Sequence, residues 1–178
     1  MKKITLVYGL IAGVIVSASM LLSISGMFDT EGAVDFDKGM IIGYASMLIA
    51  FSMVFIGIRN YRNNYNGGVI SFGKAFKVGG IIVLIASTVY VVSWLIDYFY
   101  FIPDFMEKYA EHTIANLRAA GATQAEIDQQ VQEMADYAEM YKNPFINAGF
   151  TYMEILPPGL IVTLISALIL KRKEKTIA

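Results

Sequence analysis

Four long apolar runs, interrupted by a single charged residue, are the feature that most constrains this chain. The runs are Ile4–Ser25, Gly39–Ile58, Val78–Ile96 and Phe145–Leu170, and the charged residue is Glu154. Each run is long enough to cross the roughly 30 Å hydrocarbon core of a bilayer as a helix. The runs do not alternate as barrel strands do, and in lipid only helices and closed barrels satisfy the backbone. The sequence therefore predicts an all-α membrane protein, with residues 1–178 forming one four-span domain.

Composition agrees with a membrane location. Hydrophobic residues make up 56% of the chain and charged residues 16%, whereas a soluble domain carries about 25% charged residues. The absence of cysteine excludes disulfides, thiol chemistry and cysteine-ligated zinc. Ser17-Ala18-Ser19 resembles a signal-peptide cleavage site, but the apolar run continues beyond it, so we expect an uncleaved first span.

The distribution of lysine and arginine predicts how the chain is threaded. Four basic residues lie in the connections 26–38 and 97–144: Lys38, Lys108, Arg118 and Lys142. Ten lie on the other side: Lys2, Lys3, Arg59, Arg62, Lys74, Lys77, Lys171, Arg172, Lys173 and Lys175. Because basic residues concentrate on the cytoplasmic side, we expect both termini to be cytoplasmic.

The longest connection, residues 104–143, predicts an amphipathic helical hairpin outside the cytoplasm. Gly121 is suited to end a first helix, and Thr123 with Glu126 forms a capping box that starts a second. Asn143-Pro144 then begins the fourth span. The spacing of the apolar residues of the second helix predicts that they share a buried face; these are Ile127, Val131, Met134 and Ala138.

The shorter connections have less specific features. Residues 26–38 read as an acidic turn without the spacing of a calcium-binding loop. Gly68 to Ala75 approximates a phosphate-binding loop, but an alanine stands where the magnesium-binding hydroxyl belongs. We expect instead an interfacial segment beginning at Ser71, with Ile70, Phe72 and Phe76 in the headgroup layer and Lys74 and Lys77 on anionic lipid.

Aromatic and metal-ligating residues near the outer interface allow two further interpretations. Trp94, Tyr98 and Tyr100 are typical of an aromatic belt, with Asp97 near the headgroups. Asp104, Glu107, Glu111 and His112 share a helical face that permits a metal hypothesis, but no recognised ligand set is present. We therefore predict no metal site and no cofactor.

Glu154 is the candidate for a functional residue within the membrane. It precedes Pro157 and Pro158, which lack N–H groups and leave the carbonyls of Met153 and Glu154 without helical donors. A carboxyl at this depth is costly, so we expect it to be neutral unless water or an ion reaches it. At matching depth the other spans offer four hydrogen-bonding partners, which are Ser17, Ser46, Thr88 and Tyr90.

Small residues recur at four-residue spacing in the first two spans. Gly9, Gly13 and Ser17 form one stripe, and Gly39 and Gly43 begin another. Such stripes allow two helices to approach closely, and we expect them to do so within this chain.

Several segments together resemble one family of bacterial integral membrane proteins, the domain-of-unknown-function 4199 family, found mainly in Bacteroidota. The most specific segment is Gly67-Gly68-Val-Ile-Ser71-Phe72-Gly73-Lys74-Ala75-Phe76-Lys77, supported by Tyr8-Gly9, Gly39 to Met47, Pro103-Asp104-Phe105 and Tyr141-Lys142-Asn143-Pro144. The resemblance implies a multi-pass protein of the inner membrane with a periplasmic hairpin. It implies no activity and no site.

Three classes of function remain open at this stage. The first is a non-catalytic scaffold or accessory subunit that contacts a periplasmic or membrane protein through the hairpin. The alternative is an ion- or proton-coupled carrier or channel component centred on Glu154 in a proline-kinked fourth helix. It would need a homo-oligomer because four spans rarely enclose a pathway. An enzyme is the least favoured class, because the sequence offers no nucleophile–base pair. Apart from lipid, we expect protein partners and no nucleic acid.

Overall fold

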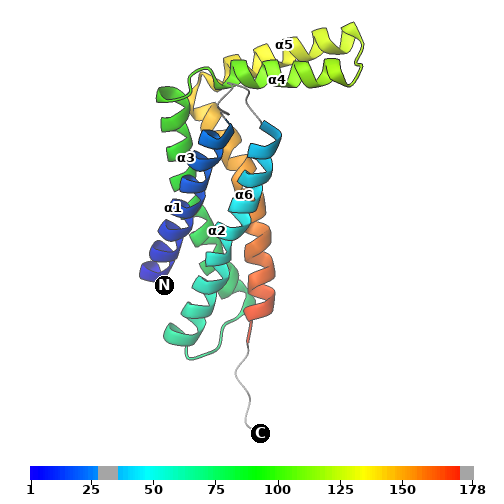
Figure 1. The fold of residues 1–178 in the computed structure, drawn as a ribbon. Coiled ribbons are helices and arrows are strands. Elements are labelled where there is room, and N and C mark those ends of the chain that lie inside the picture. The colour runs from blue at the N-terminus through cyan, green and yellow to red at the C-terminus, as the bar shows by residue number, and fades with distance from the viewer. Residues whose placement is uncertain (28–35, 173–178) are drawn as a thin grey trace.

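The computed structural model describes residues 1–27 and 36–172, and within these ranges it contains six helices. Most of the acidic connection predicted at 26–38 and the end of the basic tail lie outside the described residues. Figure 1 shows the arrangement, in which the helices are α1 Lys2–Met27, α2 Phe36–Tyr65, α3 Phe72–Tyr100, α4 Phe105–Ala119, α5 Gln124–Tyr141 and α6 Pro144–Leu170.

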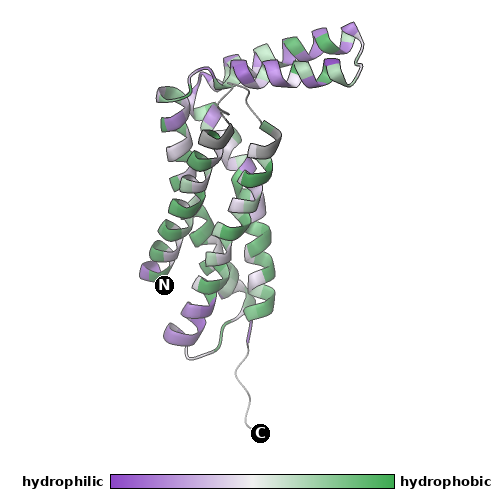
Figure 2. Ribbon diagram, in the orientation of Figure 1, coloured by the Kyte–Doolittle hydropathy of each residue, from purple (hydrophilic) through white to green (hydrophobic). Residues whose placement is uncertain are grey.

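The four long helices form a bundle, and the two short helices form a hairpin across one end of it (Figure 1). Helix α1 packs on α2 and α3, and α6 packs on the same two helices. The start of α1 and the end of α6 lie at the end of the bundle opposite the hairpin. Apolar residues run along the bundle, whereas hydrophilic residues gather on the hairpin and at the opposite end (Figure 2).

The four long helices confirm the predicted number of spans. Their apolar segments Lys2–Ile24, Gly39–Tyr65, Phe72–Tyr100 and Pro144–Leu170 are long and apolar enough to cross a membrane. Helix α6 continues through Pro157 and Pro158 without interruption.

Glycine stripes have different roles in α1 and α2. A Cβ atom at Gly9 or Gly13 would lie 2.7 Å from the Cβ of Ile85 or Val89, so α1 approaches α3 closely there, as expected. A Cβ at Gly43 would meet nothing within 4 Å. The expectation of close approach is therefore wrong at Gly43, which faces open space.

The end of the bundle that carries the termini is closed by a short turn. Gly67 and Gly68 have φ values of 64° and 81°, and Ser71 accepts a hydrogen bond from the Lys74 N–H to cap α3. The expected interfacial segment is instead the first turn of α3. Ile70 is only 1% exposed and forms an antiparallel bridge with Arg172, so its predicted place in the headgroups is wrong.

The hairpin confirms the predicted caps but not the whole buried face. Gly121 has a φ of 78° after α4, the Thr123–Glu126 capping box starts α5, and Asn143 caps α6. In α5, Ile127 and Met134 are buried, whereas Val131 is 44% exposed. Because α5 packs against a single helix along most of its length, only a narrow line of its side chains is covered.

Candidate functional site

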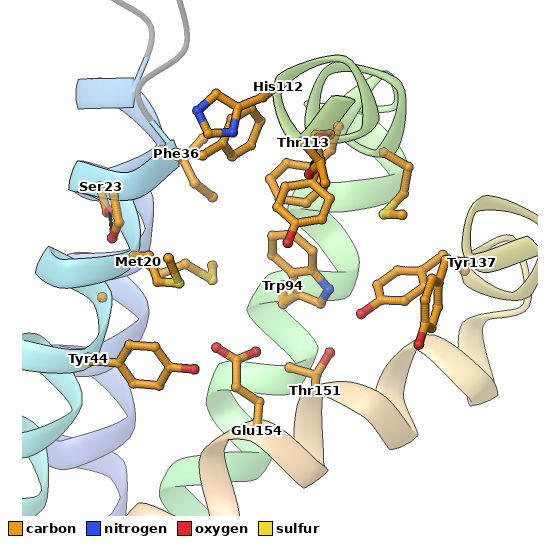
Figure 3. A pocket seen from close by; sticks show the side chains of 18 of the residues that line it. Met20, Ser23, Phe36, Tyr44, Trp94, His112, Thr113, Tyr137, Thr151 and Glu154 are labelled. Carbon is orange, nitrogen blue, oxygen red and sulfur yellow. Dashed lines mark hydrogen bonds between the residues drawn. The ribbon is translucent and has the colours of Figure 1, made fainter. Parts of the chain in front are cut away.

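A cavity of about 870 Å³ lies between the hairpin and the end of the bundle that the hairpin covers. All six helices contribute to its wall, and Figure 3 shows many of the side chains that project into it. Aromatic residues contribute the largest side chains of the wall: Phe36, Tyr44, Tyr90, Trp94, Phe105, Tyr109, Tyr137 and Tyr141. Methionines add a flexible apolar surface, from Met20, Met40, Met47, Met106 and Met134.

Two features of the sequence create this space. Gly39 and Gly43 of α2 lie in the wall, where the absence of side chains leaves room. The Ser23 hydroxyl donates to the Gly39 carbonyl at 2.9 Å, which holds α1 against α2 at the cavity. The hairpin lies across this end of the bundle (Figure 1), and residues of α4 and α5 complete the cavity wall.

The cavity ends inside the bundle rather than passing through it. Nearer the termini the core is filled by side chains that have no exposed surface, among them Phe51, Val54, Ile58, Ile82 and Ile155. Gly159 reinforces this closure, because a Cβ there would lie 2.6 Å from Val83 and 2.9 Å from Phe51. The site is therefore a one-sided pocket at the hairpin end.

Glu154 of α6 projects into this pocket, toward Tyr44 of α2 and beside Thr151 (Figure 3). Its side chain is exposed to the cavity rather than enclosed by neighbouring helices. No described residue donates a hydrogen bond to its carboxyl or pairs with it. The carboxyl therefore faces the cavity, and its neutral or ionised state stays a prediction.

The four partners predicted for Glu154 fall into two groups. Ser46 and Tyr90 share the cavity wall with it, although the Ser46 hydroxyl donates to the Ile42 carbonyl at 2.6 Å. Ser17 is buried outside the wall, and its hydroxyl has no hydrogen-bond partner among the described residues. Thr88 lies on the exposed side of α3 and bonds the hydroxyl of Tyr152 at 2.9 Å.

Pro157 and Pro158 lie about one turn beyond Glu154 and do not line the cavity. Lys74 and Lys77 lie at the opposite end of the bundle, exposed near the start of α3. The Lys74 ammonium donates to the Asn66 side chain at 2.6 Å and lies 5.6 Å from the centre of the Tyr61 ring. These two lysines are therefore separate from the site around Glu154.

Trp94 and Tyr98 join the hairpin to the bundle, so their predicted place in an outward-facing aromatic belt is wrong. The Trp94 indole N–H donates to the Asn147 side chain at 2.9 Å, and its ring packs edge-on against Phe105 at 5.1 Å. Tyr98 is 6% exposed and packs against Tyr141. A hairpin that covers this end of the bundle needs an apolar surface to pack on, and the rings of Trp94 and Tyr98 provide it. Of the three aromatic residues, Tyr100 is the one that stays exposed.

Two acidic groups considered from the sequence are also placed differently. Asp97 is buried, and its Oδ2 atom has no hydrogen-bond partner among the described residues. Asp104 forms an ion pair with Lys108 at 2.7 Å, and this hydrogen bond lowers the pKa of the Asp104 carboxyl. Within the described ranges, no three histidine, cysteine or acidic side chains are placed to hold a metal ion.

Phe36 is a site residue that sequence reasoning missed, and His112 was considered there only as a metal ligand. The His112 ring lies 5.1 Å from the Phe36 ring, at the end of the cavity nearest the hairpin (Figure 3). The available signal was the density of aromatic residues on both sides of Asp104. This density of aromatic residues predicts an aromatic cluster, but it does not indicate which other segment of the chain packs on that cluster.

The fold and the pocket define a helical protein with four membrane-span-like helices and a ligand-sized cavity whose wall includes residues of the hairpin. The chain belongs to a family described as "Protein of unknown function (DUF4199)", whose model matches residues 7–172. This confirms the resemblance drawn from the sequence. No curated protein and no solved structure matches the chain.

Proposed function

We propose that this protein is a non-catalytic binding protein of the inner membrane that takes up a small, largely apolar molecule beneath its hairpin. The observation that carries this proposal is the cavity of about 870 Å³, closed toward the termini and lined mainly by aromatic and methionine side chains. Binding sites for small molecules are typically 300–1,000 Å³ with apolar walls and few polar groups. The mouth of such a pocket lies where a molecule dissolved in the membrane or at its surface can enter.

A binding role agrees with the polar groups in the described wall. Glu154 and His112 are the acid and the imidazole among them, and they come from helices at opposite ends of the cavity (Figure 3). General acid–base catalysis needs two such groups within reach of one substrate bond, with a third to orient them. The closed floor likewise favours binding over the alternative of an ion channel or carrier centred on Glu154.

The single tryptophan of the chain provides a direct test, because Trp94 lies in the cavity wall. The neutral fluorophore N-phenyl-1-naphthylamine should quench Trp94 by energy transfer, saturably, in protein reconstituted in nanodiscs. Gly43→Leu fills part of the cavity and should weaken this binding about tenfold, since it removes volume needed by the apolar ligand.

Gly73→Leu is the matched control, because Gly73 also faces open space but lies at the other end of the bundle. Binding to this variant should equal that of the unmodified protein. Quenching that does not saturate, or that is identical in the two leucine variants, would show that the fluorophore dissolves in lipid and that the cavity is not a binding site.

The hairpin supports a second candidate function, contact with a partner protein, as in the scaffold hypothesis. It extends sideways beyond the bundle (Figure 1), and nine acidic residues against three basic ones lie between Asp97 and Lys142. Anionic lipid would repel such an arm, so charge complementarity favours a periplasmic or membrane protein with a basic surface. Replacing Asp128, Gln132 and Asp136 by lysine should abolish crosslinking to that partner while leaving fluorophore binding intact; unchanged crosslinking would exclude this role.

A further inference from the structure

The charge inside the cavity is unbalanced. Glu154 contributes a carboxyl group, and among the residues whose side chains the structure describes, no lysine or arginine lines the wall. In α4, which also contributes to the wall, Lys108 forms an ion pair with Asp104. A carboxyl group in an apolar cavity is costly to ionise without a partner, and an incoming cation would offset that cost.

The rest of the wall is suited to the same charge. Tyr44, Tyr90, Trp94, Tyr109 and Tyr141 bring aromatic rings from four helices into the cavity. The face of an aromatic ring is negative, and rings around a cation contribute roughly 0.5–2 kcal/mol each as the site becomes desolvated. A carboxylate and several rings converging on one space form an arrangement that recognises organic ammonium or phosphonium groups.

The size and polarity of the cavity restrict which cation can bind. A calcium ion takes six to eight oxygen ligands, whereas the described wall offers one carboxyl and scattered hydroxyls. The methionine and aromatic surface would instead be covered by apolar groups of the ligand itself. A volume of about 870 Å³ accommodates a drug-sized molecule.

We propose that the cavity binds a lipophilic organic monocation, with the charged centre beside Glu154 and the apolar body against the aromatic and methionine wall. This inference rests on the proposed binding function and names the ligand class of the same site. Glu154 supplies the charge selectivity, and the apolar wall supplies most of the affinity. Removing the carboxylate charge therefore alters which molecules bind without preventing binding of a neutral one.

The test uses displacement of N-phenyl-1-naphthylamine, read from Trp94, in nanodiscs of zwitterionic lipid. Three displacing molecules of similar size differ in charge: the tetraphenylphosphonium cation, neutral triphenylphosphine oxide and the tetraphenylborate anion. The cation should displace the fluorophore at about tenfold lower concentration than the neutral oxide, in keeping with one ion pair and its ring contacts. The anion should be the weakest of the three.

Glu154→Gln keeps the shape of the side chain and should abolish the advantage of the cation over the neutral oxide. Glu154→Asp keeps the charge and should retain the advantage. Glu107→Gln, on the exposed surface of α4 and outside the cavity wall, is the matched control and should behave as the unmodified protein.

The outcomes separate this inference from the binding function on which it rests. Saturable fluorophore binding with no preference for the cation, or a preference that survives Glu154→Gln, overturns the cation assignment and leaves the binding function standing. A preference for the phosphine oxide also overturns it, because Glu154 would then act as a neutral hydrogen-bond donor. Failure of the fluorophore itself to bind saturably removes the binding function and the ligand class together.

Discussion

Asn147 is the residue that links the helices around the cavity most directly. Its side chain is fully buried in α6, accepts a hydrogen bond from Trp94 of α3 at 2.9 Å and donates to the Tyr141 carbonyl of α5 at 3.4 Å. Its own carbonyl accepts from Thr151. Three helices thus meet at one amide, which fixes the orientation of the indole at the cavity wall.

Replacing Asn147 by leucine should therefore destabilise the protein by about 1–3 kcal/mol, the usual cost of leaving a buried donor without a partner. The unpaired indole N–H should also shift the fluorescence of Trp94. Thermal unfolding followed by Trp94 emission measures both effects. Asn64→Leu, on the exposed surface of α2, should change neither; equal melting temperatures for the two variants would contradict the role given to Asn147.

Residue-level prediction from the sequence succeeded where the cause is local. The capping residues Ser71, Thr123 and Asn143 act within three positions of themselves, so residue type alone indicates their role. Trp94 and Asn147 are 53 positions apart. Nothing local distinguishes an indole that faces lipid from one that bonds a buried amide, and the belt interpretation failed for that reason.

At the scale of elements, α5 shows that apolar residues at helical spacing are not all buried. The stripe of α5 was expected to be covered along its whole length, but α4 covers only the line through Ile127 and Met134. Met134 also lines the cavity, whereas Val131 faces outward. The period of the pattern identifies the helix, and the number of neighbouring helices decides how wide the covered face is.

Met134→Asp and Val131→Asp should consequently differ. An aspartate at Met134 would be buried without a partner at a cost of about 2–5 kcal/mol, and should separate α5 from α4 and from the bundle. An aspartate at Val131 would remain in solvent and should cost less than about 0.5 kcal/mol. Limited proteolysis should cleave Met134→Asp between residues 124 and 141 faster than it cleaves Val131→Asp. Equal cleavage of the two variants would show that both faces of α5 are covered or that neither is.

At the scale of the whole molecule, the four spans and their order were predictable because the apolar runs are long and nearly free of charge. The cavity was not predictable, because it arises where α2 presents glycines, α6 presents Glu154 and the hairpin closes above them. These segments lie far apart in the sequence. The sequence indicated how deep in its span Glu154 lies, but it did not indicate the cavity that its side chain faces.

The orientation of this assembly in the membrane gives the last prediction. Most described basic residues outside the hairpin belong to helix ends on the side that carries the termini, among them Lys2, Arg59, Arg62, Lys77 and Arg172, whereas Lys38 lies in the first turn of α2, on the hairpin side. Because such residues are retained in the cytoplasm, we expect the hairpin and the cavity mouth to face the periplasm. The native chain has no cysteine, so single cysteines can be introduced without background.

Ala119→Cys at the hairpin tip and Asn64→Cys near the end of α2 are both exposed positions. In intact spheroplasts an impermeant maleimide should label the first and spare the second, and both should be labelled after the membrane is opened. Labelling of Asn64→Cys alone would show that the protein has the opposite orientation in the membrane. Its cavity would then take ligands from the cytoplasmic side. The site itself would be unchanged, because its wall depends on contacts within the chain, whereas the source of its ligand depends on orientation.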